Sequence, residues 1–582
     1  MNSSSPAKSL IDPSILAKLP YVDIALAKLL QEQFAPSHPE VIPLILHLSL
    51  ASRMGHLCIK VNNQEIQPPL KDLWEFEDDS VLSIVNWEEL QNMIKSSIQE
   101  LPLKLVSKIE SIDQPLSPTP IYQYQDLFYF QKQWDSESIC IQLFQQLINT
   151  PPQLPLDEQC IEHQLLQLLH DKQLLPEQAQ AIKQLSDHSL TLIAGGPGTG
   201  KTYTAGLLIK TFWEALPLIH KKKCRIALAA PTGKAAANLQ NSLNKATQYL
   251  EGLPPLQATT LHSLLGLKSN HVSSDIRAIQ ADLLVIDECS MIDIRLMSHL
   301  LRSLKPGARL ILIGDPFQLP PVGTGSFFSD MLSLCPSHQF IVLKNCLRTE
   351  LQSIVDLSQA IKDGSCSQAF QAINKSNQAL IFKQISKNSS PVEIQLSLWE
   401  EVWKHLKNTN GSNSSESFRS FRLLTPLRQG PFGVNQLNAF FFKELFKKWG
   451  EKQTFVLPIM ITSNQPKQQL FNGDIGFLVL HPPIDPAGRI HLGDYATFGD
   501  RKIPAMLLPS YEYAFCLSIH KSQGSEFDEV LVLMPEGSEH FGRELVYTAV
   551  TRARKRLEIW SSHEIFDKTL EKINSRLSRV NH

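Results

Sequence analysis

Eight consecutive residues have the types and spacing needed to hold a triphosphate. They are Gly195, Gly196, Pro197, Gly198, Thr199, Gly200, Lys201 and Thr202. The apolar run before them is typical of a buried strand and the residues after them have helical spacing, so the glycines fall in a strand-to-helix turn whose backbone N–H groups can surround phosphates. Lys201 can reach the β and γ phosphates, and the Thr202 hydroxyl can bind Mg²⁺. The segment therefore predicts a P-loop, which alone indicates only a nucleoside triphosphatase.

Two neighbouring carboxylates strengthen this interpretation. Asp287 and Glu288 directly follow an apolar strand candidate at 283–286. Beside a P-loop, one carboxylate can hold Mg²⁺ and the other can orient or deprotonate an attacking water. Gln318 follows the next strand candidate, where its amide could sense a γ phosphate. We therefore expect hydrolysis of a nucleoside triphosphate with Mg²⁺.

Three other polar residues are weak signals on their own. Gln178 lies on an expected helix ahead of the P-loop, and its amide offers the donor and the acceptor needed to read the edge of adenine. Thr232 and His262 lie in polar clusters near the ends of expected structure elements, where they could contact the phosphates of a nucleic acid. Residues of these types are more often solvated side chains than ligands, but the position of Gln178 ahead of a P-loop favours the functional interpretation for that residue.

The elements that must position these residues indicate an α/β protein. Apolar strand candidates alternate with helices in the middle of the chain, which predicts a doubly wound parallel sheet. The second half repeats the pattern without a second P-loop, and short strands with Gly and Pro punctuation predict a small β insertion in it. We expect the parallel-sheet domains at 121–345 and 346–582, with the insertion at about 455–508.

Residues 1–112 are rich in leucine at helical spacing and carry no cluster of reactive side chains. They predict a mainly helical domain used for docking. The three prolines between Gln114 and Pro120 favour extended chain, which indicates a domain boundary there.

Composition excludes several classes of function. No apolar run approaches the roughly 18 residues that a membrane helix needs, so we expect no membrane contact. The nine cysteines include no C-x-x-C pair, which argues against a zinc or iron–sulfur site and favours a reducing, cytoplasmic setting. Net charge is only −2, so nucleic acid would have to bind in a locally basic channel.

Two long strings in the second half are specific: HKSQGSEF at 520–527 and ELVYTAVTRAR at 544–554. With them, residues 170–562 resemble superfamily 1 helicases of the 5′→3′ branch and, within it, the RecD family, the alpha subunits of exodeoxyribonuclease V. The resemblance implies two RecA-like domains and an ATP-dependent 5′→3′ single-stranded DNA translocase and DNA helicase. It implies action on duplex DNA ends in double-strand break repair and recombination, together with RecB-like and RecC-like subunits. The nuclease site would lie in a partner chain.

The resemblance also implies roles for single residues. The nucleotide would be held by the P-loop, by Gln178 at adenine and by Glu526, with Thr202 and Asp287 on Mg²⁺ and Glu288 on the attacking water. The γ phosphate would be contacted by Gln318, Arg348 and Arg552. The single-strand channel would include Thr232, His262, Asn472, His520 and Lys521. Leu347 departs from the pattern, because many relatives place there an aromatic residue that stacks on adenine.

Two other functions stay open at this point. A standalone superfamily 1 helicase acting on DNA or RNA would share the motifs and need no docking surface. A non-motor ATP switch would hydrolyse ATP without dependence on single-stranded nucleic acid.

Substitution of the P-loop lysine tests the nucleotide site. Lys201→Gln removes the charge that organises the β and γ phosphates, so ATPase activity should be lost while the far-UV circular dichroism spectrum stays that of the wild type. ATPase near the wild-type level would refute the P-loop assignment.

Overall fold

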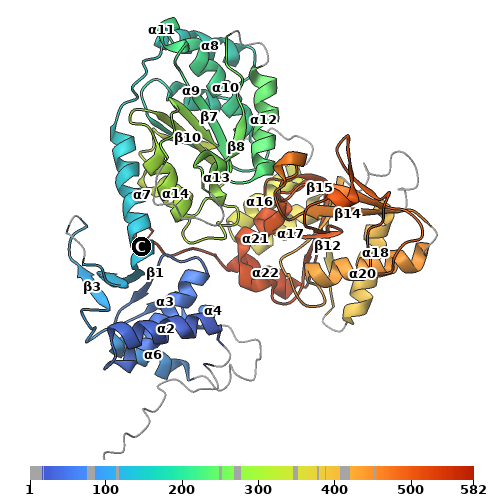
Figure 1. Ribbon diagram of the computed structural model, residues 1–582, viewed down its shortest axis with the longest axis horizontal. Coiled ribbons are helices and arrows are strands. Elements are labelled where there is room, and N and C mark those ends of the chain that lie inside the picture. Colours follow the sequence, from blue (N-terminus) through green and yellow to red (C-terminus); the bar gives the residue numbers. More distant parts are fainter. Residues whose placement is uncertain are drawn as a thin grey trace, which may run out of the picture.

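The computed structural model describes Leu16 and residues 19–74, 86–112, 114, 117–247, 252–267, 277–344, 352–376, 379–386, 389–406, 420–450 and 453–581. An N-terminal domain is followed by two parallel-sheet domains, the second of which carries an additional small sheet (Figure 1).

The first parallel-sheet domain contains the P-loop. Its six strands are all parallel, in the order β11-β6-β10-β9-β7-β8. They are β6 (Leu190–Gly195), β7 (Ile226–Ala230), β8 (Ala258–Thr260), β9 (Leu283–Ile286), β10 (Arg309–Gly314) and β11 (Phe340–Leu343). Helices around the sheet are α7 (Gln131–Asn149), α8 (Glu158–His170), α9 (Pro176–Lys183), α10 (Lys201–Ala215), α11 (Leu218–Lys221), α12 (Gly233–Thr247), α13 (Leu261–Leu264), α14 (Ile294–Ser303) and α15 (Phe327–Leu334).

Both faces of this sheet are buried, which explains its continuous apolar runs. Along β10, Leu310 and Leu312 pack in the core that includes residues of α7 and α14. The intervening Ile311 and Ile313 pack in a second core with residues of α8, α9, α10 and α12. Alternate side chains therefore enter different cores, as strand geometry requires.

The second parallel-sheet domain has five parallel strands in the order β12-β21-β20-β13-β19. They are β12 (Leu380–Gln384), β13 (Phe421–Thr425), β19 (Cys516–Ser518), β20 (Phe527–Met534) and β21 (Ala553–Ser561). Its helices are α16 (Gln352–Lys362), α17 (Cys366–Lys375), α18 (Pro391–Leu406), α20 (Val434–Trp449), α21 (Arg543–Val550) and α22 (His563–Glu571). The two parallel sheets confirm the predicted pair of α/β domains.

A small antiparallel sheet lies between β13 and β19 in the sequence. Its strands are β14 (Phe455–Ile461), β15 (Ile475–Leu480), β16 (Tyr495–Phe498), β17 (Arg501–Pro504) and β18 (Tyr511–Tyr513), in the order β17-β16-β15-β14-β18. This confirms the predicted β insertion, whose last strand reaches beyond residue 508.

The N-terminal domain has the predicted helices and also a five-stranded sheet that we did not predict. Its helices are α2 (Tyr21–Phe34), α3 (Ile42–Arg53), α4 (Leu70–Leu73) and α6 (Trp87–Ser97). Its strands, in the order β2-β1-β5-β4-β3, are β1 (Cys58–Val61), β2 (Ile66–Gln67), β3 (Val106–Ile109), β4 (Ile121–Tyr124) and β5 (Leu127–Phe130).

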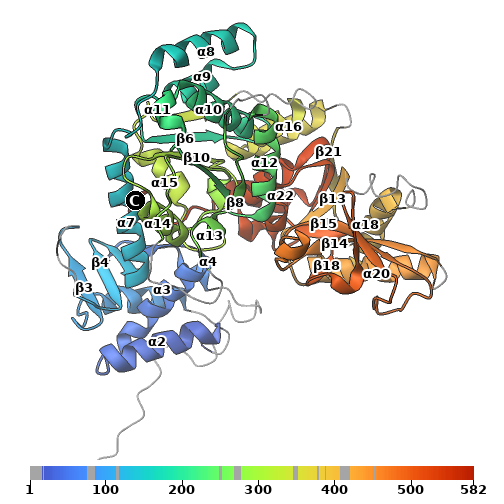
Figure 2. The ribbon, with the colours of Figure 1, turned by 45° about the horizontal axis from the view of Figure 1, so that its top comes forward.

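The boundary expected after residue 112 falls inside this sheet. The proline-rich segment joins β3 to its parallel neighbour β4, and β5 pairs with β1. Pro118 and Pro120 therefore lie in a connection within one domain, and residues 121–130 belong to the N-terminal sheet. After β5, α7 carries the chain along the first parallel-sheet domain, which Figures 1 and 2 show as the long helix beside α14. The boundary expected at 345–346 lies outside the described residues.

No helix in the described part of the chain is long and apolar enough to cross a membrane.

A substitution in β5 tests whether the N-terminal core extends past residue 112. Phe128 is fully buried in the core formed with α3 and α6. Phe128→Ala should lower the free energy of unfolding by about 3–5 kcal/mol, because it leaves a cavity in that core. Leu103→Ala is the control, since Leu103 is 82% exposed. Equal urea midpoints for the two variants would contradict the extended core.

Candidate nucleotide site and nucleic-acid interface

The P-loop lies between the end of β6 and the start of α10. Gly198 and Gly200 have φ angles of 77° and 80°, a backbone region that favours glycine. A Cβ on Gly195 would lie 2.6 Å from Thr199 Oγ1, so this glycine permits the close return of the loop. The predicted strand-to-helix turn is confirmed, and it points the first N–H groups of α10 toward the loop.

Lys201 and Thr202 are the first residues of α10. Lys201 Nζ donates hydrogen bonds to the Gly195 and Gly196 carbonyls, at 2.8 and 2.9 Å. Thr202 Oγ1 donates to Asp287 Oδ2 at 3.2 Å. The structure thus brings a hydroxyl and a carboxylate together, and these oxygen ligands suit Mg²⁺.

Glu288 lies directly beside Asp287, at the end of β9. Its φ of 56° is in the left-handed region, which is uncommon for a residue other than glycine and is often found at functional sites. Burial, and then the Asp287 carboxylate, raise the pKa of Glu288 to about 7. Its Oε2 is buried and accepts no hydrogen bond from any described residue. A carboxylate with a pKa near neutrality is suited to accept a proton from water.

The two parallel-sheet domains enclose a polar cavity of about 550 Å³. The first domain contributes Lys201, Thr202, Asp287, Glu288 and Gln318 to its wall. The second contributes Gly524, Ser525, Glu526, Arg552 and Arg554. Most of the predicted catalytic residues therefore line one cavity, although they lie far apart in the sequence.

Arg552 is only 3% exposed and is fixed from three sides. Its guanidinium donates to the Thr548 carbonyl at 2.9 Å, to the Ser525 carbonyl at 3.1 Å and to Thr551 Oγ1 at 3.3 Å. Because all three acceptors are neutral, its positive charge is not cancelled by these contacts. Glu526, in contrast, accepts from Arg554 at 2.9 Å.

Gln318 connects the cavity to the second domain through Asp315. Gln318 Nε2 and the Tyr547 hydroxyl both donate to Asp315 Oδ2, at 3.1 and 3.0 Å. The next residue, Leu319, donates its backbone N–H to Thr548 Oγ1 at 2.9 Å. The predicted γ-phosphate sensor is therefore hydrogen-bonded, through one carboxylate, to the helix that precedes Arg552.

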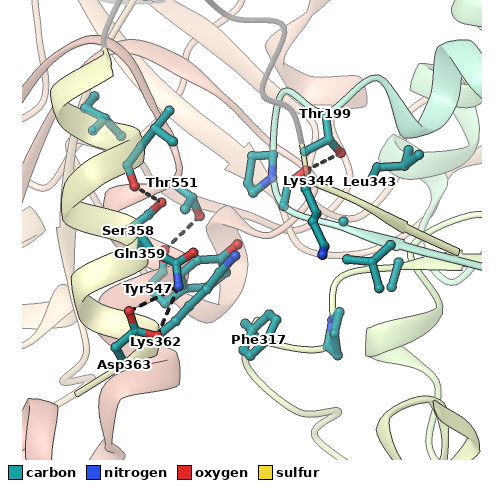
Figure 3. Close-up of a pocket in the computed structure, with 18 of the residues that line it drawn as sticks. Thr199, Phe317, Leu343, Lys344, Ser358, Gln359, Lys362, Asp363, Tyr547 and Thr551 are labelled. Carbon is teal, nitrogen blue, oxygen red and sulfur yellow. Dashed lines mark hydrogen bonds between the residues drawn. The ribbon is translucent and has the colours of Figure 1, made fainter. Parts of the chain in front are cut away.

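A second cavity of about 560 Å³ adjoins the P-loop (Figure 3). Thr199 and Leu343 line it from the first domain, whereas Lys362 and Tyr547 line it from the second. Lys362 Nζ lies 4.6 Å from the centre of the Phe317 ring and 5.0 Å from that of Tyr547. This wall is partly apolar and borders the phosphate loop, so it suits a nucleotide base.

Three of the residues lining this cavity, Phe317, Lys362 and Tyr547, were not predicted from the sequence. Tyr547 lies inside the string at 544–554 and Phe317 directly precedes Gln318, whereas Lys362 is part of no motif. Burial lowers the pKa of Lys362.

Gln178 is hydrogen-bonded to the P-loop. It is 1% exposed, its Oε1 accepts from the Leu175 N–H at 3.0 Å, and its Nε2 donates to the Thr199 carbonyl at 3.4 Å. Both ends of the amide are thus engaged with the protein, in the helix start and in the P-loop.

The predicted DNA residues lie on separate elements. Thr232 Oγ1 accepts from the Ala235 N–H at the start of α12, and the Asn472 N–H donates to Asn464 Oδ1. A Cβ on Gly233 would lie 2.8 Å from Phe471 Cβ, so the structure brings the Thr232 and Asn472 segments together across the two domains.

The other nucleic-acid residues are more scattered. His262 is exposed on α13, and His520 is half-buried, with a pKa lowered by burial. Lys521 pairs with Glu512 at 2.6 Å. Arg348, predicted at the γ phosphate, lies outside the described residues.

Comparisons with known proteins agree with this arrangement. Residues 173–381 match the family model for an AAA domain, and residues 513–559 match that for a UvrD-like helicase C-terminal domain. A Mycolicibacterium smegmatis protein named RecBCD enzyme subunit RecD is 36% identical over 405 residues, which cover 66% of this chain and 70% of that protein. The chain belongs to the RecD family.

Two further relatives define how far the likeness extends. A RecD from Buchnera aphidicola subsp. Schizaphis graminum is 27% identical and covers 93% of this chain and 96% of its own length, so the RecD likeness includes the N-terminal domain. The ATP-dependent RecD2 DNA helicase of Deinococcus radiodurans is 29% identical over 66% of this chain, but over only 48% of its own length. The predicted membership of the RecD family is confirmed.

A conservative substitution separates nucleotide binding from hydrolysis. Glu288→Gln keeps the size of the side chain and removes the base, so ATP should still bind while turnover falls by about 10² or more. Fluorescent nucleotide titration and steady-state ATPase measure the two effects. Glu564→Gln, at an exposed glutamate on α22, is the control. Equal loss of nucleotide binding would show that Glu288 is structural.

Proposed function

We propose that this chain is an ATP-dependent 5′→3′ single-stranded DNA translocase and DNA helicase that serves as the motor subunit of a RecBCD-type helicase–nuclease. The observation that supports the proposal most is the composition of the polar cavity. One wall holds the P-loop, Asp287 and Glu288, and the other wall is the second domain with Arg552. A site divided in this way can link each hydrolysis event to relative movement of the domains.

The residues of this cavity have complementary roles. Lys201 and the P-loop N–H groups bind the phosphates, and Glu288 orients the attacking water and accepts its proton. Thr202 and Asp287 would hold Mg²⁺, which neutralises phosphate charge. Arg552 supplies positive charge that is most useful in the transition state.

Gln318 links nucleotide state to the second domain. A change in its hydrogen bonds at the γ phosphate alters its bond to Asp315 and, through Asp315, the contact with Tyr547. Arg348 is proposed as a further γ-phosphate contact, and Gln178 and Glu526 as nucleotide contacts.

DNA is proposed to cross the junction of the two domains. The loops that carry Thr232 and Asn472 meet there, and His262, His520 and Lys521 extend the contact surface. Backbone phosphates would be the main ligands of these residues, which fits translocation without sequence preference.

Partners are proposed from the relatives and from the near-neutral charge of the chain. RecB-like and RecC-like subunits would complete a heterotrimer acting on duplex DNA ends in the cytoplasm, with nuclease activity in a partner. The N-terminal domain is the proposed docking element. Co-purification with RecB-like and RecC-like chains tests this, and a chain that stays monomeric beside them would favour a standalone helicase similar to RecD2.

A variant at the domain junction tests the coupling. Arg552→Ala should leave ATP affinity almost unchanged and abolish DNA-stimulated turnover, because the arginine acts mainly in the transition state. Arg556→Ala, four residues along on the exposed face of β21, is the control. Persistent DNA-stimulated hydrolysis in Arg552→Ala would mean that the second domain does not complete the site.

A further inference from the structure

Residues 572–581, here called the return segment, connect three parts of the molecule. At their start, the Lys572 carbonyl accepts from the Arg543 N–H at 2.9 Å, and the Asn574 N–H donates to Glu544 at 3.0 Å, which fixes the segment to α21. Farther on, the Leu577 carbonyl accepts from the Leu57 N–H at 2.9 Å. Figure 1 shows the segment passing from α22 to the lower end of α7, beside β1.

Arg576, in the middle of the segment, holds the loop that follows Gln318. Its guanidinium donates to three backbone carbonyls of this loop, those of Pro321, Gly323 and Gly325. The Gly325 N–H in turn donates to the Gly55 carbonyl of the N-terminal domain, at 2.8 Å. A Cβ on Gly55 would clash with the Arg576 guanidinium, so the turn before β1 packs directly on it.

The loop held by Arg576 begins next to the nucleotide cavity. Leu319 separates Gln318 from Pro320, and its carbonyl accepts from Gln523 Nε2 at 3.2 Å. A smaller cavity of about 180 Å³ is lined by both Gln318 and Arg576. The return segment therefore forms part of the wall of a cavity that Gln318 also lines.

The end of the return segment is anchored to α7. Glu137 is fully buried, accepts from the Arg579 N–H at 2.9 Å and faces the Arg579 guanidinium. That guanidinium lies 4.5 Å from the centre of the Trp134 ring. Removing one partner of such a buried pair is costly, so this end resists release. A shift of the N-terminal domain or α7 would consequently move Arg576.

We propose that Arg576 is a positioning residue for ATP hydrolysis, which holds the 320–325 loop so that Gln318 reaches the γ phosphate and makes turnover depend on the placement of the N-terminal domain. The inference rests on the proposed helicase function. Because Arg576 donates its hydrogen bonds to loop carbonyls and to none of the described residues proposed to bind ATP, its loss should reduce kcat and leave KM unchanged.

Substitutions of Arg576 in the full chain test this role. Arg576→Ala should lower the DNA-stimulated kcat by about ten- to a hundredfold, the scale of a small misplacement in an active site, with KM for ATP within about twofold. Arg576→Lys keeps charge and some donors and should recover part of the loss. Arg489→Ala is the control, since its side chain is 79% exposed on the β insertion.

Each outcome has a distinct meaning. A wild-type kcat in Arg576→Ala, or a change in KM alone, would overturn the role of Arg576 while leaving the helicase function intact. A wild-type chain without DNA-stimulated ATPase would overturn both.

Hydrogen exchange on the wild-type chain covers the case in which Arg576→Ala fails to fold. Amide protection is compared with and without single-stranded DNA and a non-hydrolysable ATP analogue. The amides of Leu57 and Gly325 should change protection together with that of Leu319. A change confined to Leu319 would overturn the proposal.

Discussion

The contact on which this architecture depends is the shared carboxylate of Asp315. Gln318 approaches it from the first parallel-sheet domain and Tyr547 from the second, and Asp315 and Tyr547 are both buried. A buried carboxylate is stable only when it is hydrogen-bonded, so the hydrogen bonds to Asp315 fix the position of the two domains relative to each other at this point. The same junction brings Gln318 to the polar cavity that Arg552 lines from the second domain.

The strands that are buried on both faces of the first parallel sheet were the easiest elements to predict from the sequence. The runs at 283–286 and 310–313 are apolar throughout, and the run at 190–194 is apolar except for Thr191, because their alternate side chains pack in two different cores. Strands such as β8, β19 and the five of the N-terminal sheet have only two to four residues, too few to show a period. Pairing between β1 and β5 also depends on residues about 70 positions apart, which no local pattern reveals.

The site divides in a similar way. Lys201, Asp287, Glu288 and Gln318 were predictable because each follows a strand at the edge where the P-loop lies. Lys362 and Arg576 were not predictable. Lys362 lies near two aromatic rings and Arg576 binds three backbone carbonyls, and neither kind of contact produces a recognisable spacing of residues in the sequence. The inward turn of Gln178 toward the P-loop likewise required the fold, because both partners of its amide are backbone groups.

The contacts of Lys201 bear on how the site selects its ligand. Its ammonium already donates hydrogen bonds to two backbone carbonyls of the same loop. An anion that binds the ammonium must therefore replace these hydrogen bonds. A single weakly charged oxyanion gains little by displacing neutral oxygens that are already well placed. A polyphosphate offers several charged oxygens at once and also engages the N–H groups of the loop. The two carbonyl contacts of Lys201 therefore favour a polyphosphate over a small anion as the ligand of this loop.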